Sequence, residues 1–176
     1  MIRRRTPDCQ ARQQLTVLLL DIEKGLDKDG KKMETVALIL MAQYLGDIIC
    51  LVREQTTVGE YDLAAIAIKQ QTHVPPIVLE AKSRDKPAGV NVVIKLEAMM
   101  DYAKTHFGLI VSNKGLTRKA WSRLDQITKV DTDFRIGVIS TKNIREQILG
   151  SSLEIQDSVA GLFLKTRFHE VFGKKY

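Results

Sequence analysis

Three charged residues stand in two otherwise apolar segments of the chain. Glu80 and Lys82 close the segment Ile77–Lys82, and Asp62 lies early in the preceding segment, Tyr61–Ile68. Residues i and i+2 of a β-strand point to the same face, about 6–7 Å apart, so Glu80 and Lys82 project together. A charge near a buried sheet face is costly unless it is paired or bound to a metal. The alternative is a strand end that simply emerges into solvent, because Glu-x-Lys is a common tripeptide.

The pairing of the two segments decides whether a second carboxylate, that of Asp62, lies near Glu80. If they are antiparallel neighbours, the beginning of one lies beside the end of the other, and Asp62 comes close to Glu80. A divalent cation relieves the repulsion between two carboxylates, and oxygen ligands favour Mg²⁺ or Mn²⁺. Lys82 beside such an ion can orient a water or stabilise charge on a phosphate, which suits phosphodiester hydrolysis. Glu60, at the start of this stretch, is interpreted as a surface charge.

The hydrophobic pattern predicts the order ααβββαβαβα for the elements that position these residues. Strands that are apolar on both faces indicate a sheet covered by helices on each side, in one mixed α/β domain. We expect a three-strand meander that leads through a helical crossover into a fourth strand. The predicted helices are Gln13–Lys24, Met33–Tyr44, Val92–His106 and Arg118–Ile127, and the predicted strands are Asp47–Arg53, Tyr61–Ile68, Ile77–Lys82, Phe107–Ser112 and Phe134–Ser140.

Four pieces of the sequence carry a family resemblance. They are GEYDL at Gly59–Leu63, VLEAK at Val78–Lys82, a helix that holds Glu97, and LIVSNKGLTRKA at Leu109–Ala120. Together they resemble the PD-(D/E)XK nuclease superfamily, and are most similar to Mrr-like restriction endonucleases and archaeal Holliday-junction resolvases. The resemblance covers roughly Met33–Ser140, and Tyr61 stands where the superfamily's eponymous proline would be. It implies a restriction-endonuclease-like fold with a mixed central sheet of about five strands flanked by helices, in the core order α-β-β-β-α-β-α-β.

The resemblance also implies roles for individual residues. Asp62 and Glu80 would be metal ligands for Mg²⁺ or Mn²⁺, the backbone carbonyl of Ala81 would complete the site, and Lys82 would be the catalytic lysine. Glu34, in the first turn of its helix, occupies the place of a further site carboxylate. Its alternative role is a helix N-terminal charge stabilised by the helix dipole. Glu97 falls where Mrr-like proteins often carry Gln or Glu, and its alternative is a solvated helix edge.

Basic residues follow the core acids. The chain has a net charge of +6 and a pI of about 9.3, which is compatible with a polyanionic partner. Two strand ends on one rim of the sheet carry the cluster Arg84, Lys86, Lys114, Arg118, Lys119 and Arg123. We expect this cluster to straddle the phosphate backbone of DNA, and a solvated helix face is the alternative. Trp121 and Tyr102 stand beside apolar helix positions, which favours the core over base stacking.

One domain accounts for all 176 residues, with a core of about 33–140, an N-terminal arm (1–11) and extra helix in 1–32, and a C-terminal helical extension in 141–176. No apolar segment reaches the length of a membrane span. Two cysteines and three scattered histidines form neither a disulfide framework nor a zinc site, and with no secretory signal the expected location is cytoplasmic.

The sequence therefore favours a divalent-metal-dependent DNA endonuclease that hydrolyses phosphodiester bonds. Cutting both strands of a duplex needs two sites, which favours a homodimer. Two alternatives stay open: a non-cleaving nucleic-acid-binding or assembly module of the same fold, and a nuclease toxin domain with an immunity partner. The intact set of Asp62, Glu80 and Lys82 speaks for the nuclease over the non-cleaving module.

Overall fold

The computed structural model describes residues 9–45, 48–56, 59–67, 77–130 and 135–145. Its elements are α1 (Cys9–Glu23), α2 (Lys31–Leu45), β1 (Ile48–Thr56), β2 (Gly59–Ala67), β3 (Ile77–Lys82), α3 (Val90–Ala103), β4 (Phe107–Ser112), α4 (Arg118–Val130), β5 (Arg135–Ser140) and α5 (Thr141–Ile144). The order is the predicted one, and the mixed α/β class is confirmed. The predicted arm is too long, because α1 begins at Cys9. The expected C-terminal extension lies outside the described residues from residue 146 on.

The described strands form one sheet in the order β1-β2-β3-β4-β5. The first three strands are an antiparallel meander, in which Leu63 of β2 pairs with Leu79 of β3. The last three are parallel, and Lys82 of β3 pairs with Ser112 of β4. The predicted meander and helical crossover are both confirmed. Parallel strands place their carboxyl ends at one rim, so the end of β3, with Glu80 and Lys82, lies beside the end of β4.

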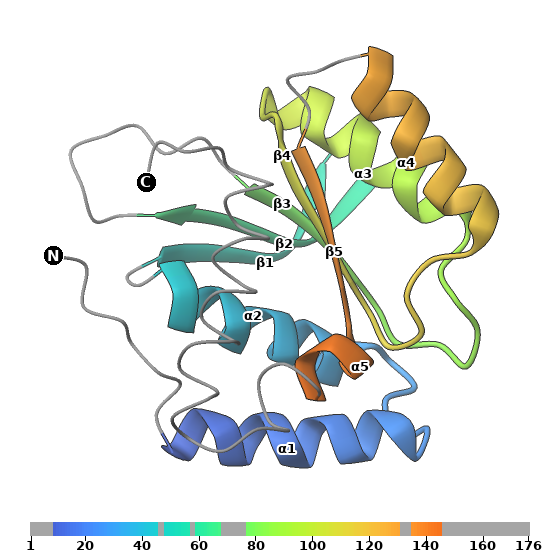
Figure 1. The fold of residues 1–176 in the computed structure, drawn as a ribbon. Coiled ribbons are helices and arrows are strands. Elements are labelled where there is room, and N and C mark those ends of the chain that lie inside the picture. The colour runs from blue at the N-terminus through green and yellow to red at the C-terminus, as the bar shows by residue number, and fades with distance from the viewer. Residues whose placement is uncertain (1–8, 46–47, 57–58, 68–76, 131–134, 146–176) are drawn as a thin grey trace, which may run out of the picture.

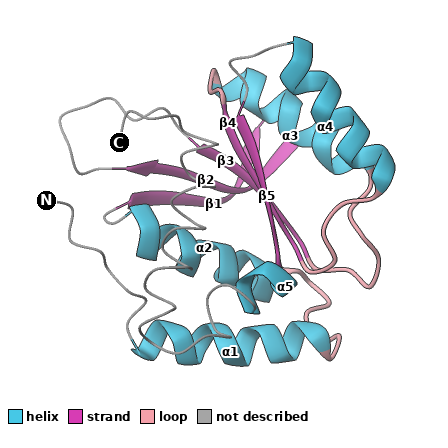
Figure 2. Ribbon diagram, viewed as in Figure 1, coloured by secondary structure: helices cyan, strands magenta, loops and turns pink. Residues whose placement is uncertain are grey.

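Helices cover both faces of this sheet. Figures 1 and 2 show α3 and α4 on one face, and α2 on the other with α1 outside it. Buried side chains from α3, α4 and the strands form one apolar cluster between the layers, including Val78, Val93, Leu96, Met100 and Ile110. Val93, Leu96 and Met100 recur at spacings of three and four, which gives α3 the apolar stripe it lays on the sheet.

The amino end of α2 is held by side chains from the preceding loop. The two carboxylate oxygens of buried Asp27 accept from the backbone N–H groups of Lys32 at 2.9 Å and Met33 at 3.0 Å. Asp29 accepts from the N–H of Lys31 at 3.2 Å, and the Lys31 side chain holds the pKa of the Asp29 carboxyl below its usual value. These bonds satisfy N–H groups that have no partner within the helix.

Two aromatic residues lie where the sequence did not predict them. Trp121 is 43% exposed and Tyr102 is 48% exposed, so neither is a core residue. The buried residues of α4 are Ala120, Leu124 and Ile127, and Trp121 lies one position off that stripe. None of the described helices is both long and apolar enough to span a bilayer.

Candidate functional site

A fully buried carboxylate lies at the carboxyl end of β3. The side chain of Glu80 is 0% exposed, whereas that of Lys82, two residues on, is 22% exposed. Side chains alternate along a strand, so Glu80 and Lys82 share the sheet face of Val78, which packs into the cluster with α3 and α4. Because a buried charge is costly unless it is compensated, Glu80 needs cationic partners.

Two ammonium groups supply that compensation. The Nζ of Lys82 lies 2.9 Å from Glu80 Oε2, and the Nζ of Lys95, from α3, contacts Glu80 Oε1. The proximity of Lys82 follows from the i, i+2 spacing read from the sequence. Lys95 was not predicted, although it follows Val92 by three residues and precedes Met99 by four, and so borders the buried stripe of α3. A lysine at such an edge can bury its stem and direct its charge to a neighbouring group.

The strand position of Asp62 lies next to that of Glu80. Leu63 pairs with Leu79 in the antiparallel ladder, so one further step of the register sets Asp62 opposite Glu80. The antiparallel pairing on which the predicted meeting of the two carboxylates depends is confirmed. The side chain of Asp62 lies outside the described residues, and its role as a metal ligand stays a prediction.

The direction of the backbone carbonyl of Ala81 follows from the pairing of β3. The N–H of Asn113 donates to the carbonyl oxygen of Lys82 at 3.2 Å, so the Lys82 carbonyl points toward β4. Successive carbonyls of a strand point to opposite sides, and that of Ala81 therefore points toward β2 and Asp62. A carboxylate, a carbonyl and a second carboxylate position fit a hard divalent cation. Among the described side chains, no three His, Cys, Asp or Glu residues converge into a group that could hold a metal ion.

The loops that follow β3 and β4 are joined into one rim. The N–H of Ala88 donates to the carbonyl oxygen of Gly115 at 2.9 Å, and the N–H of Thr117 donates to the carbonyl oxygen of Ala88 at 3.0 Å. Asn113 adds a third link, since its Oδ1 accepts from the N–H of Arg84 at 3.2 Å. The loop residues are therefore positioned together rather than independently.

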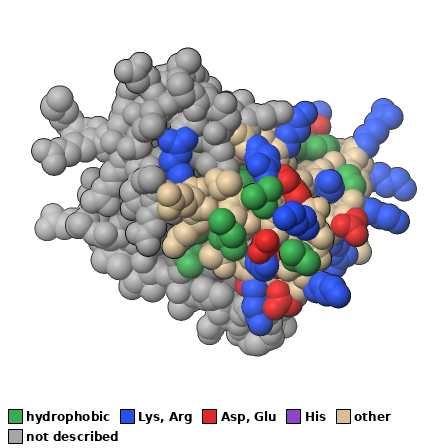
Figure 3. Space-filling view, turned by 90° about the horizontal axis from the view of Figure 1, so that it is seen from below, with side chains coloured by type: hydrophobic (Ala, Val, Ile, Leu, Met, Phe, Trp, Pro, Cys, Tyr) green, Lys and Arg blue, Asp and Glu red, His purple; other side chains and the backbone are tan. Residues whose placement is uncertain are grey.

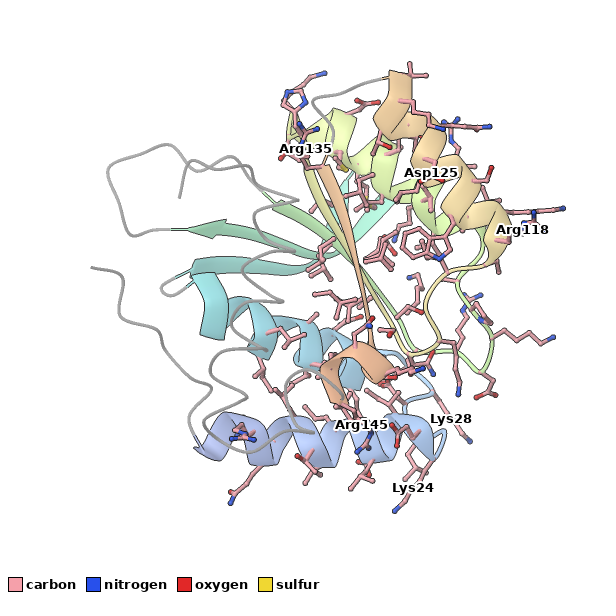
Figure 4. The ribbon with its side chains drawn as sticks, viewed as in Figure 1. Lys24, Lys28, Arg118, Asp125, Arg135 and Arg145 are labelled. Atoms are coloured by element: carbon pink, nitrogen blue, oxygen red, sulfur yellow. The ribbon has the colours of Figure 1, made fainter. Side chains whose placement is uncertain are left out.

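Exposed basic side chains project from this rim. Those predicted from the sequence are Arg84, Lys86, Lys114, Arg118 and Lys119, and all five are exposed. Figure 3 shows lysine and arginine side chains spread over the described surface, several of them projecting at its edge, and Figure 4 shows Arg118 extending outward from the start of α4. A hollow of about 430 Å³ opens beside Lys82, with Arg84 and Lys86 in its lining. The rim can therefore present positive charge to an anionic chain next to Glu80.

Glu97 of α3 is paired with Arg123 of α4. Both of its carboxylate oxygens accept from Arg123 Nη2 of α4, at 3.1 and 2.7 Å, in an ion pair that joins the two helices. Glu97 is two positions from Lys95, about 200° around the helix axis. The structure therefore brings Lys95, and not Glu97, into contact with Glu80, and it removes Arg123 from the free basic cluster. The role of Glu97 as a further site residue stays a prediction.

Glu34 lies in the first turn of α2, as predicted, and is half-buried. Its helix packs against the sheet on the face opposite α3 (Figure 1). Glu34 would therefore approach the end of β3 from the other side than Lys95 does. Its role as a further site carboxylate stays a prediction.

Comparison with known families gives one match. The restriction endonuclease family model Mrr_cat matches residues 28–141, well over half of the chain and nearly the range of the predicted resemblance. The matched range begins just before α2 and contains Glu80, Lys82 and Lys95. Searches of curated proteins and of solved structures found no significant match. The chain belongs to the Mrr_cat restriction endonuclease family.

Proposed function

We propose that this protein is a divalent-metal-dependent endonuclease that hydrolyses phosphodiester bonds in DNA. The observation that carries the proposal is the buried carboxylate of Glu80, which lies beside the strand position of Asp62 and in contact with Lys82. Family membership supports nuclease chemistry in general. A carboxylate of this kind has no evident packing value, since burying it costs free energy that an apolar side chain would not.

The proposed metal ligands are Asp62, Glu80 and the carbonyl oxygen of Ala81, with Glu34 as a further carboxylate. When bound, Mg²⁺ or Mn²⁺ would supply a Lewis acid and lower the pKa of a coordinated water. The buried location of Glu80 favours this role, because electrostatic interactions are stronger where water is excluded.

Lys82 is the proposed catalytic lysine. Its ammonium group lies 2.9 Å from Glu80 Oε2, and its side chain is 22% exposed and lines the hollow. From that position it can donate a hydrogen bond to the attacking water or to a phosphate oxygen on which charge develops. Hydrolysis would leave a phosphate on one product end and a hydroxyl on the other.

The basic rim would hold the DNA. Arg84, Lys86, Lys114, Arg118 and Lys119 would neutralise phosphates on either side of the scissile bond. Because both loops of the rim are joined through Ala88, the phosphate contacts and Lys82 would be held in one frame. Cleavage of both strands of a duplex would use two copies of the site in a homodimer.

Incubation of supercoiled plasmid with the full chain tests the proposal. We expect nicked and then linear DNA with Mg²⁺ or Mn²⁺, and no cleavage with excess chelator. Lys82→Ala should lower the cleavage rate by about 100-fold or more, the usual effect of losing one group that stabilises a transition state. Lys129→Ala is the matched control, because Lys129 is an exposed lysine in the last turn of α4, outside the proposed site.

Two results would contradict the proposal. One is the absence of metal-dependent cleavage by the native protein, which with retained DNA binding would favour the non-cleaving module. The other is cleavage by Lys82→Ala at the native rate. Circular dichroism of each variant separates loss of chemistry from loss of fold.

A further inference from the structure

Lys95 contacts Glu80, and the proposed chemistry gives it no role. We propose that Lys95 competes with the divalent metal for Glu80 and thereby sets the metal concentration at which the site fills. This inference rests on the proposed metal site. It concerns the regulation of that site rather than the identity of its ligands.

The competition follows from how the two oxygens of Glu80 are used. Oε2 contacts Lys82 and Oε1 contacts Lys95, and the carboxylate exposes no surface through which an ion could reach it otherwise. A cation that coordinates either oxygen of Glu80 therefore approaches an atom that an ammonium group already contacts, and the like charges repel. Charge balance points the same way, because two lysines and a divalent ion around one or two carboxylates leave excess positive charge in a site of low dielectric.

Of the two lysines that contact Glu80, Lys95 can move away more easily than Lys82. It reaches Glu80 from α3, a different element, on a flexible four-carbon stem, whereas Lys82 is fixed to the same strand two residues away. The side chain of Lys95 is also more exposed to solvent, at 33% against 22% for Lys82. Metal binding would thus release Lys95 and retain Lys82 next to the reaction.

The size of the effect on metal affinity depends on the fraction of molecules in which Lys95 contacts Glu80. A ligand that binds only the open state has its affinity reduced by the fraction of molecules in that state. If the contact between Lys95 and Glu80 is formed in about nine molecules of ten, its loss makes metal binding about tenfold tighter. Lys95→Gln is the informative change, since an amide can still donate a hydrogen bond to Glu80 but carries no charge.

Isothermal titration calorimetry, with Mn²⁺ added to the metal-free full chain, tests the inference. We expect Lys95→Gln to bind Mn²⁺ about tenfold more tightly than the native protein. Lys129→Gln removes an equal charge from an exposed position of α4 and should stay within about twofold of native. Lys95→Arg keeps the charge and can pair with the carboxylate through two N–H groups, so its affinity should equal the native value or fall below it.

A second measurement, the Tm, is made first in chelator, where no metal is bound, and then with Mn²⁺. In chelator, Lys95→Gln should lower the Tm, because the buried Glu80 then loses one of its two described cationic partners. Addition of Mn²⁺ should raise the Tm of this variant by more than it raises that of the native protein. An equal or higher Tm in chelator would contradict the inference, as would an equal rise with Mn²⁺.

The controls separate this inference from the proposed function. If the native protein binds Mn²⁺ and Glu80→Gln abolishes the binding, the metal site stands. Native-like or weaker affinity of Lys95→Gln, or tighter binding by Lys95→Arg, then overturns the role of Lys95 alone. If neither the native protein nor Lys95→Gln binds Mn²⁺, both the inference and the proposed metal site fail.

Discussion

Gly108 of β4 tests the packing that brings α3, and with it Lys95, onto the sheet. A Cβ atom added at Gly108 would lie 2.6 Å from Met100 Sδ and 3.0 Å from Leu96 Cδ2, both on α3. Side chains must therefore shift, and overpacking of a buried site costs about 1–3 kcal/mol. Gly108 has no positive φ, so alanine restricts the unfolded chain and recovers about 0.4–1 kcal/mol. We expect Gly108→Ala to lower the free energy of unfolding by about 1–2 kcal/mol.

Urea denaturation followed by circular dichroism measures this change, and a double-mutant cycle identifies its cause. Met100→Ala alone should cost about 2–5 kcal/mol through the cavity it leaves. With Gly108→Ala also present, the new methyl group occupies part of that space, so Met100→Ala should cost about 1 kcal/mol less. Additive costs, or a stabilising effect of Gly108→Ala, would show that α3 does not lie on β4 as described.

Three further predictions concern the α2 cap, the pair between α3 and α4, and the basic rim. Asp27→Ala should lower the free energy of unfolding by about 1–2 kcal/mol in urea, because two hydrogen bonds at the start of α2 are lost; an unchanged midpoint would contradict the cap. Glu97→Gln should cost less than about 1 kcal/mol, since the pair with Arg123 is partly exposed; a large loss of cleavage at native stability would instead return Glu97 to the site. Arg118→Ala should reduce the slope of log affinity for DNA against log salt concentration by about one, measured by fluorescence anisotropy, whereas Lys129→Ala should not change it; equal slopes for Arg118→Ala and the native protein would remove Arg118 from the interface.

Most of the fold could be predicted, because local sequence patterns mark its helices and strands. Ile77–Lys82 and Phe107–Ser112 were placed at their observed bounds, since each is a short, largely apolar run, the first preceded by two prolines and the second by His106. The start of α1 was missed because residues 9–12 are polar or small and show no helical period. Trp121 was misplaced because its apolar character was taken as burial, whereas the stripe of α4 passes through Ala120.

The site was predictable only where it depends on local geometry. Glu80 and Lys82 meet because of the two-residue repeat of a strand, and that repeat can be read from the sequence. Lys95 and Glu97 are two positions apart on α3, and each borders the apolar stripe. Which of them reaches Glu80 depends on how α3 is rotated against β3 and α4, and packing across the whole layer sets that rotation.

A crystal structure of the full chain with Mn²⁺, located by its anomalous scattering, tests the central claim most directly. We expect one ion at coordination distance, about 2.0–2.6 Å, from carboxylate oxygens of both Asp62 and Glu80 and from the Ala81 carbonyl. In the same crystal, we expect Lys82 to stay beside Glu80 and Lys95 to have moved away. An ion bound elsewhere, or Glu80 still held by both lysines at saturating Mn²⁺, would contradict it.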